Sequence, residues 1–309
     1  MPPPVINPPR KSTFSRAMLY FLLGLALLMG ASAWLGQFLG NSNGVGHEKL
    51  AIVEIVGFIS DSREVVRQIR KFREDDSILG IILRIDSPGG AVAPSQEFYR
   101  EVLRTRKSGA KKIFVSMGTV AASGGYYIAA PADRIFANPG TLTGSIGVVM
   151  AFTNLEGLMG KIGLRPEIVK AGKFKDTGSP ARKMRPYERK YLEKVVGDVH
   201  KQFIAAVAKG RHLSLAKTRK LADGRIFTGR QAVGLKLVDQ LGGLEDTIEA
   251  MGKLLGAEGR PRVVQESPDP GLVDWLLRSK VAAQIKTSLL TSGFPGLHFL
   301  WTPGNGGLR

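Results

Sequence analysis

The sequence contains no cysteine and only four histidines in 309 residues. The lack of cysteine excludes disulfide bonds, thiolate metal sites and a cysteine nucleophile. None of the histidines lies in a glycine-rich loop, and no cluster of histidines and carboxylates indicates a metal site. A Ser/His/Asp triad is therefore disfavoured, although it stays open because residues far apart in sequence can meet in space. We expect no metal and no cofactor. The histidines are His47, His200, His212 and His298.

Acidic residues are also few, with 26 Asp and Glu against 44 Lys and Arg, so the formal net charge is +18. The basic residues are spread over runs at 67–73, 182–190 and 209–220, which contain few aromatic residues. This pattern is typical of solvated helix faces or of a surface that favours anionic lipid. We expect no nucleic-acid partner.

The N-terminal region has the pattern of a membrane anchor. Residues 1–16 are proline-rich and carry Arg and Lys, and residues 17–39 form an uncharged, mostly apolar stretch. Such a stretch is long enough to span a bilayer as a helix, and the preceding positive charge predicts a cytoplasmic N-terminus. The alternative is a cleaved signal peptide, because residues 31–33, Ala-Ser-Ala, resemble a cleavage site. Residues 40–49 are expected to be a linker.

From residue 50 onward, short apolar runs alternate with amphipathic segments, which predicts an α/β fold with crossover helices. We expect a domain over residues 50–258 and a C-terminal extension over 259–309 with an amphipathic helix at 271–290. In the helix predicted at 186–209, an apolar stripe from Tyr187 to Val207 is interpreted as core. Strands are expected at 51–56, 81–85, 113–117, 134–137 and 166–169, and further helices near 65–72, 94–105, 126–129 and 244–255.

Ser123 stands at a predicted strand-to-helix turn, in the sequence Val-Ala-Ala-Ser-Gly-Gly-Tyr-Tyr at 120–127. Small neighbours let another backbone approach closely, and a helix N-terminus adds free N–H groups and partial positive charge. This environment suits a nucleophile. The same stretch is equally compatible with a tight packing turn in which Ser123 is a helix cap.

Two further loops have compositions that suit catalysis. Residues 86–90, Asp-Ser-Pro-Gly-Gly, leave main-chain N–H groups free to bind a developing oxyanion, although Pro-Gly-Gly is also an ordinary turn. Ser145 is flanked by glycines and is either a rival nucleophile or a helper. With histidine and metal disfavoured, a lysine is the remaining candidate for the base, provided that burial and nearby positive charge make it neutral.

Five motifs together resemble the signal peptide peptidase A family of membrane-anchored serine peptidases. The resemblance implies a fold of the Clp protease and crotonase superfamily, built from repeated β-β-α units. It also implies Ser123 as nucleophile, Lys175 as general base, Ser145 as a support for the lysine, and the N–H groups of Gly90 and Gly124 as the oxyanion hole. The motifs lie at 86–90, 120–127, 141–147, 174–176 and 223–232.

Each of these roles has a structural alternative. Lys175 lies among other cations and by spacing alone would be a solvated surface residue. Ser145 is compatible with a turn terminus, and Gly89 is an alternative donor to Gly90.

The resemblance implies an endopeptidase with a Ser/Lys dyad at the bacterial inner membrane, with its domain on the extracytoplasmic side. Its substrates would be cleaved signal peptides and other apolar peptides, and it would contact membrane lipid. It would assemble as a homo-oligomer, and in one arrangement a neighbouring protomer would complete the site. The alternatives are a crotonase-like acyl-transfer enzyme and a non-catalytic membrane scaffold.

Overall fold

The computed structural model describes residues 24, 27, 49–257, 259–266 and 298–300. The chain divides into two units, Met1–His47 and Glu48–Arg309, and the fold below is that of the second unit. Of the predicted span at 17–39, only the helical residues Gly24 and Leu27 are described, and the helix predicted at 271–290 lies outside the described residues. Among the helices that the structure describes, none combines the length and the apolar character needed to cross a bilayer.

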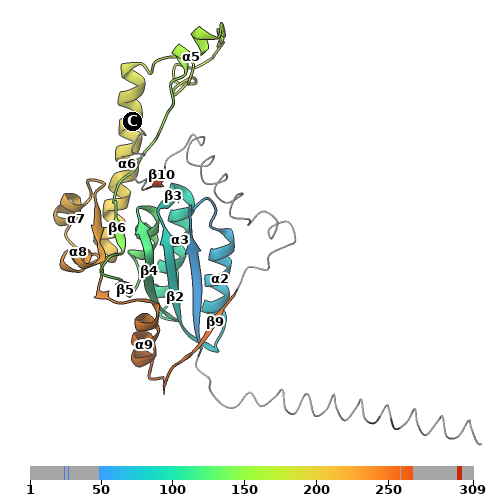
Figure 1. The fold of residues 1–309 in the computed structure, drawn as a ribbon, viewed down its shortest axis with the longest axis vertical. Coiled ribbons are helices and arrows are strands. Elements are labelled where there is room, and N and C mark those ends of the chain that lie inside the picture. Colours follow the sequence, from blue (N-terminus) through green and yellow to red (C-terminus); the bar gives the residue numbers. More distant parts are fainter. Residues whose placement is uncertain (1–23, 25–26, 28–48, 258, 267–297, 301–309) are drawn as a thin grey trace, which may run out of the picture. The chain divides into compact units, whose positions relative to one another are not determined.

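An eight-stranded sheet forms the centre of the second unit (Figure 1). Its main path has the order β7-β6-β4-β2-β1-β9, all neighbours are parallel except β6 and β7, and β5 and β8 extend from β4. A second, two-stranded sheet pairs β3 with β10. The strands are β1 (Lys49–Val56), β2 (Ile78–Ser87), β3 (Gly89–Ala91), β4 (Lys112–Ala122), β5 (Arg134–Ala137), β6 (Leu142–Gly144), β7 (Ile226–Thr228), β8 (Gln240–Leu241), β9 (Arg262–Gln265) and β10 (His298–Leu300).

The central strands are apolar on both faces because helices cover both faces. Alternate residues of β1, β2 and β4 point to opposite sides: Val115 joins the core under α2, α3 and α4, whereas Phe114 packs with Ile248 and Met251 of α9. The helices are α2 (Arg63–Glu74), α3 (Val92–Lys107), α4 (Gly124–Ala129), α5 (Glu156–Lys161), α6 (Pro186–Gly210), α7 (Leu215–Leu221), α8 (Gly229–Gly234) and α9 (Leu244–Leu255).

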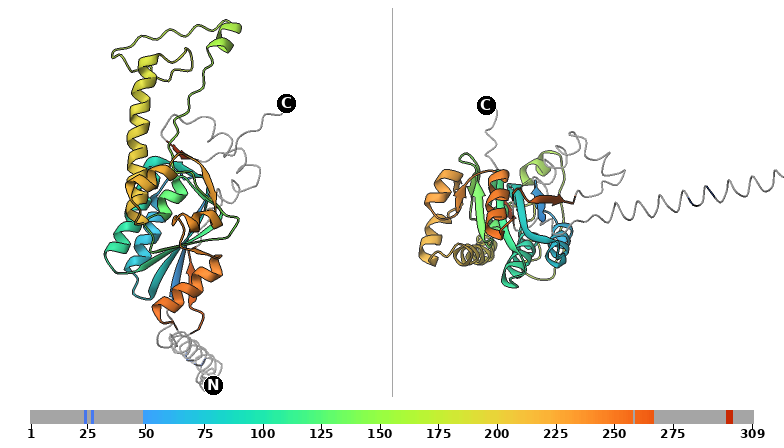
Figure 2. Two further views of the ribbon diagram at one scale, coloured as in Figure 1. Left: turned by 90° about the vertical axis from the view of Figure 1, so that its left-hand side faces the viewer. Right: turned by 90° about the horizontal axis from the view of Figure 1, so that it is seen from below.

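Helix α6 is the longest of the helices that the structure describes and runs well beyond the sheet (Figures 1 and 2). Its C-terminal part packs on the core, where Phe203 and Val207 are buried. Its N-terminal part carries residues 150–185, called here the α5 lobe, which lies beyond the end of the sheet.

The α/β fold and most predicted elements are confirmed, but two predictions are wrong in part or in full. Residues 166–169 are not a strand, and Val169 is fully exposed because this segment has no neighbouring strand to pair with. The apolar stripe of α6 is core only near its C-terminal end, since Tyr191 is 45% exposed where the helix has left the domain.

Candidate active site

Ser123 lies between the end of β4 and the start of α4, as the sequence predicts. Its backbone has φ 53° and ψ −113°, a conformation that non-glycine residues rarely adopt. Its N–H donates to the carbonyl oxygen of Gly144 at 2.8 Å, and the residue is 99% buried within this chain. A strained residue that is held by its surroundings at a strand-to-helix turn is typical of a functional site.

Ser145 follows the neighbouring strand β6 and is brought beside Ser123 by the sheet register. Ala122 pairs with Gly144 in the parallel ladder, so the next residue of each strand is a serine. Ser145 also has a positive φ of 48°, and its N–H donates to the Arg225 carbonyl oxygen at 2.8 Å. Two strained, buried serines therefore share the carboxyl end of adjacent strands.

The glycines of the 86–90 loop pack directly against Gly124. A Cβ atom built on Gly124 would lie 2.8 Å from Ser95 Oγ and 3.1 Å from the Gly90 nitrogen, so only glycine fits there. The Gly89 N–H already donates to Ser87 Oγ at 3.1 Å. This bond favours Gly90 over Gly89 as the donor that is available to a ligand.

Strand β10 lies on this loop as an added antiparallel strand, with Phe299 opposite Gly90. The backbone of its first residue, His298, also exchanges two hydrogen bonds of 3.0 Å with Val149 on its other side. A Cβ atom built on Gly89 would lie 2.1 Å from the Phe299 carbonyl oxygen and 2.7 Å from the Gly124 nitrogen. The Phe299 carbonyl oxygen thus lies beside Gly89, close to the nitrogen of Gly124.

The side chain of Phe299 is fully buried in an aromatic pocket. Its ring stacks on Tyr127 at 5.0 Å between centroids and contacts Phe203 at 4.7 Å, and the Tyr99 ring also lies 5.0 Å from that of Tyr127. Burial raises the pKa of Tyr127 to about 12, so this pocket is uncharged at neutral pH. The pocket therefore fits a large apolar side chain.

A cleft of about 580 Å³ opens beside Ser145 and is bounded by Val148, Phe152 and the α6 residues Val196 and His200. The Nε2 atom of His200 is buried and has no hydrogen-bond partner among the described residues. His200 was not predicted as a site residue, because it lies in a basic helix outside the glycine loops. Its spacing of four from Val196 is the one signal that would have placed it on the cleft face of α6.

Lys175 lies in the α5 lobe, apart from the serines of its own chain. The adjacent Phe174 packs on Tyr187 and Tyr191 in the N-terminal half of α6, whereas Phe203 near the other end of α6 packs on Tyr127 of α4. These contacts are 12–16 residues apart along the helix, which corresponds to about 18–24 Å. The structure thus brings Ser123, Ser145, Gly90 and Gly124 together, but not Lys175 from the same chain.

Lys175 also differs from its neighbouring lysines. Lys170 binds Asp176, and the Lys173 ammonium lies 4.3 Å from the centre of the Tyr187 ring. Lys175 is exposed, and its ammonium group has no partner within the part of the chain that the structure describes. Of the three lysines, it is the one available to act elsewhere.

Comparison with known proteins assigns the chain to a family. The model that describes peptidase family S49 matches residues 105–258, which include both serines and Lys175. A Synechocystis sp. protein named for an inferred protease activity is 42% identical over 68% of this chain and 76% of its own length. The chain is a member of peptidase family S49. Family S49 membership makes it a serine peptidase.

Two further relatives agree with the S49 assignment. A Methanocaldococcus jannaschii protein, also named for an inferred protease activity, is 35% identical over 80% of this chain and 84% of its own length. An Enterococcus faecium protein named as an inferred signal peptide peptidase SppA is 36% identical over 68% of this chain and 64% of its own length. The resemblance drawn from the five motifs is thereby confirmed at the level of the family.

Proposed function

We propose that this S49 peptidase cleaves extended apolar peptides with Ser123 as the nucleophile. The observation that carries the proposal is the strand β10, whose Phe299 carbonyl lies at Gly89 and Gly124 beside the strained Ser123 turn. A peptide bound in the same way adds a strand to β3 and presents one carbonyl to the Gly90 and Gly124 N–H groups.

The aromatic pocket under Phe299 supports a preference for substrates with a large apolar side chain. Main-chain hydrogen bonds to an added strand bind any sequence, so the pocket supplies the selectivity. Signal peptide remnants have this character, and the E. faecium relative is named for such substrates. The apolar stretch at 17–39 supports an anchor that keeps the domain beside the membrane where those remnants lie.

Lys175 is the proposed base, supplied by a neighbouring copy of the chain. The length of α6 separates it from its own Ser123, and the α5 lobe that carries it exposes Leu158, Ile162 and Leu164. Exposed apolar side chains gathered on one segment mark an interaction surface. A second copy that covers this lobe brings Lys175 into the cleft beside Ser145, whose hydroxyl then holds the amine.

The chemistry follows from this arrangement. Neutral Lys175 takes the Ser123 proton as Oγ attacks the carbonyl carbon, and the two glycine N–H groups hold the oxyanion. The lysine ammonium then protonates the leaving amine as the peptide bond breaks. Water, deprotonated by the same lysine, hydrolyses the acyl-enzyme and frees Ser123.

Intact mass after incubation with an acylating peptide inhibitor tests the nucleophile. We expect one adduct on the wild type and on Ser145→Ala, and none on Ser123→Ala. Loss of the adduct only in Ser145→Ala would exchange the roles of the serines. A wild type without any adduct would contradict the proposed activity and favour a scaffold.

A further inference from the structure

The segment that carries Lys175 is a short series of turns. The N–H of Lys175 donates to Gly172 at 3.3 Å, that of Thr177 to Phe174 at 3.1 Å, and that of Ser179 to Asp176 at 3.1 Å. Turns have low local stability because few buried contacts hold them, and here the ring of Phe174 provides packing on α6. The orientation of the Lys175 side chain therefore depends on a further attachment of this segment.

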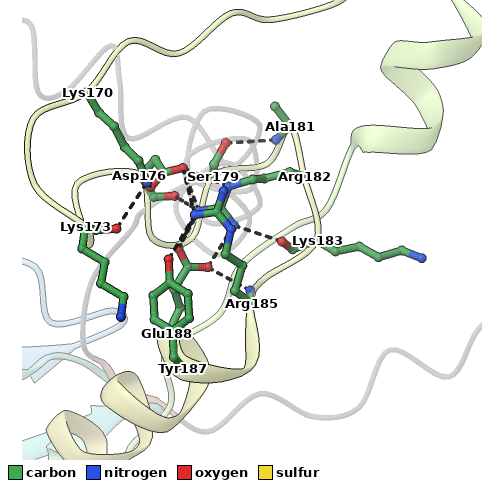
Figure 3. A network of polar contacts seen from close by, with 10 residues as sticks. All are labelled: Lys170, Lys173, Asp176, Ser179, Ala181, Arg182, Lys183, Arg185, Tyr187 and Glu188. Carbon is green, nitrogen blue, oxygen red and sulfur yellow. Dashed lines mark hydrogen bonds and ion pairs between the residues drawn. The ribbon is translucent and has the colours of Figure 1, made fainter.

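Arg182 fixes this segment to the start of α6, as Figure 3 shows. Its guanidinium donates to the Asp176 carboxylate at 2.9 Å and to the Asp176 carbonyl oxygen at 3.0 Å. The same group donates to both carboxylate oxygens of Glu188 at 2.5 and 2.9 Å. Arg182 therefore makes four hydrogen bonds that join the residue after Lys175 to the first turn of α6.

Glu188 anchors the other end of this network. Its side chain is fully buried, and one of its oxygens accepts the Arg185 N–H at 2.9 Å, which closes the capping box of α6. Asp176 is 8% exposed and also binds Lys170, with Arg185 at 3.9 Å. None of the charged groups in this network takes part in the proposed hydrolysis.

Both carboxylates stay ionised over the working pH range. The bond from Lys170, together with Arg182, lowers the pKa of Asp176 to about 2, and Arg182 with the Arg185 N–H lowers that of Glu188 to about 2. The cations Lys170 and Arg182 thus balance the two carboxylates. Lys175 is therefore the sequence neighbour of an ionised Asp176 whose charge these cations balance.

We propose that Arg182 is a positioning residue for the general base: it orients the Lys175 turn through Asp176 and cancels the negative charge next to the lysine. This inference rests on the proposed function of Lys175. An aspartate without Arg182 would favour the protonated, inactive form of a neighbouring lysine, and the turn would lose its hydrogen-bonded attachment to Glu188 of α6.

The test measures peptide hydrolysis against pH in the assembled, full-length protein and in variants of Arg182. In Arg182→Met we expect kcat to fall about tenfold with KM little changed, because orientation of the base matters only in the chemical step. The pH of half-maximal activity is expected to rise by about half a unit or more, because one negative charge is uncovered.

Two further variants separate orientation from charge. Arg182→Lys keeps the charge but loses the planar fork, so we expect lower kcat at an unchanged pH midpoint. Arg182→Met combined with Asp176→Asn removes both charges. The pH of half-maximal activity should therefore return to the wild-type value, while kcat stays low. Arg260→Met is the control, because Arg260 forms an exposed ion pair with Glu245 at 2.6 Å.

A wild-type kcat and pH profile in Arg182→Met would overturn the positioning role if Lys175→Ala were inactive. Full activity of Lys175→Ala would instead overturn the proposed function. If Arg182→Met failed to assemble, Arg182→Lys would decide, because wild-type kcat in that variant contradicts the need for the fork.

Discussion

The end of the sheet around Ser123 and the α5 lobe around Lys175 are built in opposite ways. Ser123, Ser145 and the paired glycines are buried and held by backbone hydrogen bonds to neighbouring strands. Lys175 is exposed and is supported by an ionic network rather than by a core. The difference teaches that folding of one chain fixes Ser123 and the glycines beside it, whereas Lys175, the proposed base, would need a neighbouring copy of the chain to reach them.

The largest expected effect in this comparison is the loss of turnover in Lys175→Ala. Because the Lys175 side chain is exposed and makes no hydrogen bond or ion pair with the described residues, its truncation should leave thermal stability unchanged. Lys173→Ala removes the cation over the Tyr187 ring and should retain turnover. Peptide hydrolysis and thermal unfolding of both variants test this, and equal losses in both would show that Lys175 has no special role.

In the buried region around Ser123, Gly124→Ala should abolish hydrolysis and lower the free energy of unfolding. The added methyl meets Ser95 Oγ at 2.8 Å and the Gly90 nitrogen at 3.1 Å. Overpacking of this kind destabilises by about 1–3 kcal/mol and would displace an oxyanion donor. Gly140→Ala is the matched control, because a Cβ there meets nothing within 4 Å. Denaturant unfolding with an activity assay checks both, and normal activity in Gly124→Ala would remove this glycine from the site.

A smaller effect is expected at the strand that occupies the groove. Phe299→Ala empties the aromatic pocket and weakens β10, so an added peptide should be hydrolysed about three- to tenfold faster at low concentration. Initial rates at substrate concentrations below KM measure this, and Leu254→Ala, at an exposed apolar residue of α9, is the control. Unchanged or slower hydrolysis would mean that β10 does not compete with substrate.

The smallest effect concerns the ionic network of the α5 lobe. The pKa values of Asp176 and Glu188 are about 2 in the folded chain, below their unfolded values of about 4. Their stabilisation is therefore complete above about pH 4 and is lost as the pH falls toward 2. Hydrogen exchange of residues 172–179 should differ between wild type and Asp176→Asn at pH 7 and converge as the pH falls below 4. Glu167→Gln should show no such difference, and a gap that persists at low pH would contradict this assignment.

The sequence predicts the rigid region better than the lobe for a physical reason. Buried strands such as 113–117 and 134–137 are recognisable because most of their residues are apolar, and the Ser123 turn is recognisable from its small residues. The apolar residues at 166–169 have the same local character, but they lack a neighbouring strand and remain exposed. Local pattern alone does not distinguish these two cases.

Long-range contacts account for the rest. Three residues of β10 are too few for a pattern, so their pairing with Gly89–Ala91 was not predictable. The five motifs identify Lys175 as a candidate base, but its separation from Ser123 follows from the length of α6 and its packing.

Mixed assemblies of two inactive variants test the central claim most directly. Ser123→Ala and Lys175→Ala would be co-expressed with different tags, and hydrolysis measured on assemblies that contain both. If Lys175 acts on the Ser123 of a neighbouring copy, random mixing creates one intact site in four, so about a quarter of wild-type activity should return. No recovery in verified mixed assemblies would contradict a base supplied by a partner.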